Sequence, residues 1–164
     1  MKRREFLKTA AAAGAALSLP GGLTPIIGAL EAAEAADLVV AHGKSVDRTV
    51  RAAINGMGGM NRFIARGDIV VVKPNMGWDR TPEYAANTNP EVVSTLVRLC
   101  LEAGAKKVKV FDRSVNDARR TYKQSGVADA AAKAGAEVSF IDDRKYRDAK
   151  INGKVLKTWP VYTE

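Results

Sequence analysis

Five polar residues of this sequence stand where α/β proteins bind small ligands, directly after predicted strands or at the start of a predicted helix. They are Lys73, Asn75, Asn89, Asp112 and Ser114. The Lys73 ammonium and the Asn75 amide can donate hydrogen bonds to a phosphate or a carboxylate. The helix expected after Asn89 presents free N–H groups and the positive end of its dipole. These residues therefore predict a site for a small anionic ligand.

The acidic and hydroxyl residues allow two interpretations. Asp112, followed by Ser114, could hold a ribose or a metal ion at the end of a strand, but aspartate is also common in turns. Loops between strands and helices can equally be polar only because they face water. His42 is the single histidine and could act as a base or a metal ligand, although a lone histidine beside a glycine is more often a surface residue. We therefore assign no catalytic residue, no metal site and no cofactor.

Alternating apolar runs and helical patterns must position these side chains. The expected strands are 37–41, 69–72, 108–111 and 137–141, and the expected helices begin near residues 46, 90, 118 and 127. The run 69–72 contains only Ile and Val, which is typical of a central strand buried on both faces. Since parallel strands end at one edge of a sheet, we expect the polar residues that follow them to converge on a single rim. That set comprises His42, Lys44, Lys73, Asn75, Asp112, Ser114, Asp142 and Asp143.

The short connections between these elements predict an α/β fold, namely a three-layer, Rossmann-like, mostly parallel sheet with helices on both faces. Asn152-Gly153 predicts a terminal β-hairpin with a two-residue turn. Cys100 lies in the apolar stripe of the helix that follows Asn89, so we expect it in the core. The glycines within 55–59 follow a helix instead of a strand and so do not form a dinucleotide-binding fingerprint.

Composition excludes several functions. The 164 residues carry a formal net charge of +8, and 46% of them are apolar, which is typical of a globular protein. Cys100 is the single cysteine, so this chain cannot hold an iron–sulfur cluster by itself. The Lys and Arg residues are scattered and are not interleaved with aromatic residues, so we do not expect nucleic-acid binding.

The first 35 residues differ from the rest and are interpreted as an export signal. Arg3, Arg4, Phe6 and Leu7 stand before a long apolar run, and this arrangement resembles a twin-arginine translocation signal. Lys2 replaces the usual Ser or Thr. Prolines and glycines at 20–25 interrupt the run, whereas a membrane span needs about 20 apolar residues. We therefore predict cleavage after Ala35, with an uncleaved membrane anchor as the alternative, and a mature α/β domain over 36–164. The predicted partner is the twin-arginine translocation machinery, and the predicted compartment is periplasmic or otherwise extracytoplasmic.

A family resemblance follows from motifs spread over the mature chain. They are Gly-Gly-Met-Asn-Arg-Phe at 58–63, Gly-Asp-Ile-Val-Val-Val-Lys-Pro-Asn at 67–75, Thr-Asn-Pro-Glu-Val-Val at 88–93 and Glu-Ala-Gly-Ala-Lys-Lys-Val at 102–108. Together they resemble the domain of unknown function numbered 362, and more narrowly its twin-arginine-exported members. The resemblance implies a fold and a compartment, but no reaction. It also implies a longer protein, with a second Lys-rich, His-containing motif after Glu164, so we expect a C-terminally truncated chain. Some relatives carry ferredoxin-type cysteine clusters, which this chain lacks.

Two functional hypotheses follow. The first is an exported domain that binds an anionic small molecule or cofactor at the strand ends, as part of an enzyme or redox system. The second is a non-catalytic binding module or accessory subunit, with a partner chain along an exposed sheet edge, or an inactive fragment. Whether the protein is an enzyme is left open.

Overall fold

The computed structural model describes residues 36–163, and the predicted export signal with its cleavage point lies outside them. The helices are α2 (Val46–Gly56), α3 (Pro90–Glu102), α4 (Ala118–Gln124) and α5 (Val127–Lys133). The strands are β1 (Ile69–Val72), β2 (Lys107–Val110), β3 (Glu137–Val138), β4 (Tyr146–Lys150) and β5 (Thr158–Tyr162). Short 3-10 helices are Met60–Arg62, Pro82–Tyr84 and Asp143–Lys145. Within residues 36–163, no helix is long and apolar enough to cross a membrane.

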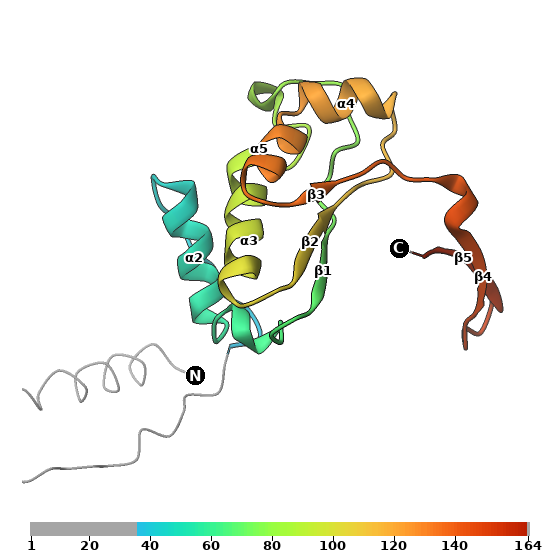
Figure 1. Ribbon diagram of the computed structural model, residues 1–164, viewed down its shortest axis with the longest axis horizontal. Coiled ribbons are helices and arrows are strands. Elements are labelled where there is room, and N and C mark those ends of the chain that lie inside the picture. Colours follow the sequence, from blue (N-terminus) through green and yellow to red (C-terminus); the bar gives the residue numbers. More distant parts are fainter. Residues whose placement is uncertain (1–35, 164) are drawn as a thin grey trace, which may run out of the picture. The chain divides into compact units, whose positions relative to one another are not determined.

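The first three strands form a parallel sheet in the order β1-β2-β3. Helix α3 connects β1 to β2, and α4 with α5 connects β2 to β3. Connections between parallel strands are right-handed. Each new strand, β2 and then β3, is added on the same side of the previous one, so the two connecting segments place α3 and α5 on the same face of the sheet (Figure 1). The predicted α/β class, with a parallel sheet flanked by helices and a terminal hairpin, is confirmed.

The core lies between α3, α5 and one face of the sheet. Val108 and Val110 of β2 are buried against it, and Val70 and Val72 of β1 pack at its border. Cys100 belongs to this core, as predicted. The remaining buried apolar members are Ile64, Met76, Val93, Val97, Tyr122, Val127 and Ala131.

The other face of β1 is open to solvent. Ile69 is 60% exposed and Val71 is 47% exposed, so the prediction that this strand is buried on both faces is wrong. The physical reason is that α3 and α5 pack on the opposite face of the sheet, so Ile69 and Val71 point to solvent. Strand β1 also stands at the edge of the described sheet. Among the described residues, no backbone hydrogen bond joins the outer edge of β1 to another segment.

Three strand predictions need correction. Residues 37–41 do not form a strand, and Leu38 and Val40 are exposed, because this segment finds no neighbouring strand among the described residues. The strand predicted over 137–141 ends at Val138, and Phe140 beyond it packs on Tyr122. The predicted terminal hairpin is confirmed as β4-β5. Its connection is 151–157 instead of a two-residue turn, since Lys150 pairs with Thr158.

The β4-β5 hairpin returns to the end of β2. Tyr162 contacts the ring of Phe111, with 5.3 Å between the ring centroids. Tyr146 packs on Tyr162, and the Arg113 guanidinium lies over the Tyr146 ring. The hairpin is therefore held to the sheet by aromatic contacts just after β2.

Candidate functional site

The strand ends bring Lys73 and Asp112 together, as the predicted rim requires. Lys73 directly follows β1, and Asp112 follows β2 after one residue. Strands β1 and β2 are in register, with Val72 opposite Val110. The Lys73 Nζ lies 2.5 Å from Asp112 Oδ1. The lysine side chain is 64% exposed and the aspartate side chain only 5%, so a buried carboxylate holds a cation that faces solvent.

Asp112 is fixed by its backbone as well as its side chain. Its Oδ2 accepts a hydrogen bond from the Met76 N–H at 2.8 Å. The buried Tyr122 hydroxyl accepts from the Asp112 N–H at 2.8 Å and donates to the Asp112 carbonyl at 2.9 Å. Burial raises the pKa of Tyr122 above its ordinary value. The hydroxyl is therefore protonated at neutral pH and can make both bonds.

The side chains of Asn75 and Ser114 are used within the chain. Asn75 Nδ2 donates to the Ala86 carbonyl at 3.1 Å, and its Oδ1 accepts from the Gly77 N–H at 3.0 Å. Ser114 Oγ donates to the Met76 carbonyl at 2.6 Å. The Asn75 bonds hold the loop after β1 in shape, and the Ser114 bond joins the loop after β2 to it.

Asn89 caps α3, as predicted. Its Oδ1 accepts from the Glu91 N–H at 2.8 Å, and Glu91 is the second residue of the helix, one of the positions that an N-cap side chain binds. His42 and Lys44 line a separate hollow of about 170 Å³ beside the start of α2. This hollow shares no lining residue with the hollows at the strand ends described below.

Each of the two aspartates after β3, Asp142 and Asp143, forms an ion pair with an arginine. Asp142 pairs with Arg144, and the hydrogen bonds from this guanidinium are the main reason that the pKa of Asp142 falls to about 2. Asp143 pairs with Arg113. A hollow of about 200 Å³ lies at the ends of β2 and β3. It is lined by Asp112, Arg113, Ser114, Ala118, Phe140, Ile141 and Asp143.

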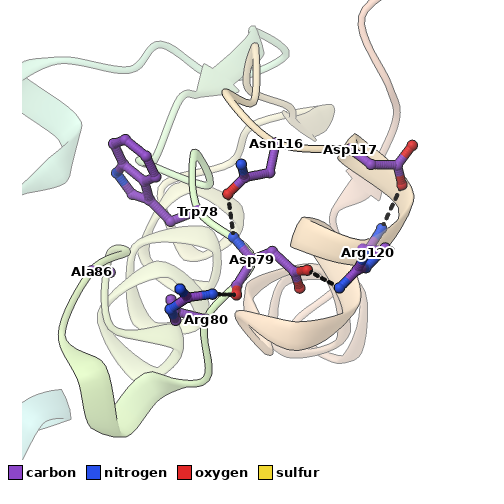
Figure 2. A pocket seen from close by; sticks show the side chains of 7 residues that line it. All are labelled: Trp78, Asp79, Arg80, Ala86, Asn116, Asp117 and Arg120. Carbon is purple, nitrogen blue, oxygen red and sulfur yellow. Dashed lines mark hydrogen bonds and ion pairs between the residues drawn. The ribbon is translucent and has the colours of Figure 1, made fainter.

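A larger hollow of about 490 Å³ lies between the loops after β1 and β2 (Figure 2). It is lined by Trp78, Asp79, Arg80, Ala86, Asn116, Asp117 and Arg120. None of these residues was predicted as part of the site. The sequence offers one signal for them, because they follow the same two strands as Lys73 and Asp112 do. One of them is a tryptophan, which is exposed in the structure. Within residues 36–163, no group of three or more His, Cys, Asp or Glu side chains could hold a metal ion.

Comparison with known proteins places the chain in a family. A model described as "Domain of unknown function (DUF362)" matches residues 70–164. The chain belongs to this family. The matched residues of this DUF362 chain include β1 from its second residue, and both strand ends that form the rim.

Two further comparisons concern export and relatives. A twin-arginine translocation signal matches residues 1–20, so the protein is exported by that pathway, as predicted. The thylakoid-associated protein sll1697 of Synechocystis sp. is 32% identical over 78 residues, which are 48% of this chain and 24% of the relative. The matched part of this chain thus spans about a quarter of that protein's length. No solved structure shows significant similarity to this chain.

Proposed function

We propose that this DUF362 chain is an exported domain that binds a small anion at the C-terminal ends of β1 and β2. Lys73 is the proposed anion contact, in a mature domain that begins near residue 36. The compartment is the periplasm or another extracytoplasmic space. The domain serves an enzyme or a redox system that acts on the bound molecule or uses it as a cofactor.

The observation that carries this proposal is the exposure of the Lys73 ammonium and its pairing with Asp112. An ammonium group has three N–H donors, and Asp112 is the one acidic partner of Lys73 among the described residues. The group is 64% exposed, so further donors are available to a ligand. Asp112 is itself held by Met76 and Tyr122, and the ammonium is therefore positioned before a ligand arrives.

The other residues of the predicted site take positioning roles in this proposal. Ser114 ties the loop after β2 to the loop after β1, Asn75 holds the loop after β1 in shape, and Asn89 caps the start of α3. Their side-chain bonds are satisfied within the chain. Lys73 is therefore the residue whose substitution tests ligand binding most directly.

The test is calorimetric titration of the full chain with inorganic phosphate and with succinate. Lys73→Gln should weaken the affinity about tenfold or more, because a charge-assisted contact contributes about 1.5–3 kcal/mol. Lys106→Gln is the matched control, since Lys106 is exposed at the opposite end of β2. An unchanged affinity in Lys73→Gln, or an equal loss in both variants, would refute the proposed contact.

The open edge of β1 favours a second candidate function, a binding module that pairs with another chain. Ile69 and Val71 expose apolar side chains on the uncovered face, and the outer backbone edge of β1 is unpaired among residues 36–163. Unpaired strand edges recruit other strands. The simplest such partner is a second copy of this chain.

Light scattering of the wild type and of Val71→Lys tests this candidate. A wild type that self-associates, together with a monomeric Val71→Lys variant, supports pairing through β1. A monomeric wild type with fast amide exchange along the outer edge of β1 would contradict pairing between copies.

A further inference from the structure

The 490 Å³ hollow beside the rim has a fixed frame. Asn87 clamps the loop after β1, because its Oδ1 accepts from the Trp78 N–H and its Nδ2 donates to the carbonyls of Trp78 and Arg80. Asn116 Oδ1 accepts from the Asp79 N–H at 3.0 Å. Both strand-end loops are thus tied together across the hollow (Figure 2).

The acidic groups of the hollow are already engaged. Asp79, whose side chain is 14% exposed, forms an ion pair with Arg120 at 2.5 Å. Asp117 Oδ1 accepts from the backbone N–H of Arg120 at 3.1 Å, which caps α4. Neither carboxylate neutralises Arg80.

Arg80 supplies an uncompensated positive charge. Its Nη1 donates to the Asp79 carbonyl at 2.8 Å, and it has no carboxylate partner among the described residues. A guanidinium carries five N–H donors, so this bond positions the group and leaves donors for a ligand. Asn116 adds its amide N–H donors, because its hydrogen bond to the described residues uses Oδ1. Arg120 also retains donors that do not contact Asp79.

Trp78 provides the apolar wall. Its side chain lines the hollow, and the residue is 46% exposed. In Figure 2 its indole lies on the other side of Asp79 from Arg120. An indole face stacks on flat rings, whereas guanidinium groups bind phosphate and carboxylate through paired hydrogen bonds.

We propose that this hollow binds a small molecule in which a phosphate or carboxylate is attached to a flat ring. The anionic group contacts Arg80, Asn116 and Arg120, and the ring stacks on Trp78. This inference rests on the proposed function, because both concern an anion at the strand ends. It specifies the ligand class and uses residues other than Lys73.

The test uses the intrinsic fluorescence of Trp78 in the full chain carrying Trp159→Phe. The sequence contains two tryptophans, and Trp159 lies in β5, outside the hollow. The probes are phenyl phosphate, benzoate, inorganic phosphate and benzyl alcohol. Phenyl phosphate or benzoate should change the fluorescence saturably. Inorganic phosphate should bind roughly two- to tenfold more weakly than phenyl phosphate, because it lacks the stacking ring.

Arg80→Gln should weaken the binding of phenyl phosphate about tenfold or more. Arg119→Gln is the matched control, because Arg119 is exposed on the same helix as Arg120 and does not line the hollow. Arg120→Gln is the second variant. It also removes the ion pair with Asp79, so its melting temperature is measured alongside, and Arg80→Gln, which keeps that pair, decides the result if Arg120→Gln fails to fold.

Each outcome separates this inference from the proposed function. Equal losses in Arg80→Gln and Arg119→Gln would mean a general attraction to basic residues and would overturn the inference. Equal affinities for phosphate and phenyl phosphate would overturn the stacking on Trp78, and so would binding of benzyl alcohol as tight as that of phenyl phosphate. Binding lost in Lys73→Gln but kept in Arg80→Gln would leave the proposed function in place and refute this site. The converse result would support this site and refute Lys73 as the contact.

Discussion

Replacing Tyr122 by Phe removes the hydroxyl that holds the backbone of Asp112, the buried acid of the candidate site. The hydroxyl bonds to both the N–H and the carbonyl of Asp112, and both residues are buried. Each buried polar group without a partner costs about 1–3 kcal/mol. The Phe ring keeps its contact with Phe140, since the ring centroids are 4.7 Å apart. We therefore expect a loss of about 2–3 kcal/mol in the free energy of unfolding, which corresponds to a Tm lower by roughly 6–12 °C.

The same variant has a pH signature with a defined sign. Burial raises the pKa of Tyr122 in the folded state, so the folded chain holds the phenol proton more tightly than the unfolded chain does. This contribution is complete below the unfolded pKa of about 10 and disappears as the pH rises through the higher folded pKa. Above about pH 10 the wild type should therefore lose more stability than Tyr122→Phe does.

Urea unfolding followed by circular dichroism measures both effects. Tyr84→Phe is the matched control, because the residue is 71% exposed and should change the free energy of unfolding by less than about 0.5 kcal/mol. A Tyr122→Phe variant as stable as Tyr84→Phe would refute the reasoning. Equal alkaline sensitivity of wild type and Tyr122→Phe would refute the pH argument alone.

Three further predictions concern a helix cap, a glycine turn and an ion pair. Asn89→Ala should lower the free energy of unfolding by about 1 kcal/mol through loss of the α3 cap, measured by urea unfolding. Gly135→Ala should destabilise the chain by roughly 1–2 kcal/mol, because Gly135 has a φ of 102° and an added Cβ would lie 3.0 Å from Leu101 Cδ1; an unchanged thermal midpoint would contradict this. The carboxyl of Asp142 should titrate at about 2 in an NMR experiment. Its contribution to stability is present above the unfolded pKa of about 3.9 and is lost as the pH falls toward the folded value, and Arg144→Gln should move the titration back toward the unfolded value.

The sequence predicted the helices better than the strands for a physical reason. Asn89 and Gly104 mark the ends of α3 through caps and a positive φ, both of which are local. Strands depend on neighbours that are distant in sequence. Leu38 and Val40 therefore resembled a strand although residues 36–163 place no partner strand beside them. The β-branched run of β1 resembled a central strand although it stands at the edge of the described sheet.

The candidate site shows the same division. Lys73 and Asp112 could be predicted to meet, because parallel strands in register end together. The bonds of Asp112 to Met76 and Tyr122 could not, since they depend on how the loop after β1 and helix α4 pack around the end of β2. The hollow around Trp78 could not be predicted either, because it depends on hydrogen bonds between two loops. The residue types alone do not specify those bonds.

The edge position of β1 also affects solubility. Its four β-branched residues form a strand whose outer edge is unpaired among residues 36–163, and such edges are prone to pairing with other chains. Asp68 and Lys73 stand immediately before and after it and can act as gatekeepers, because flanking charges oppose the stacking of identical strands. Lys73, which pairs with Asp112 in the folded protein, would thus also help to keep newly made chains apart before export.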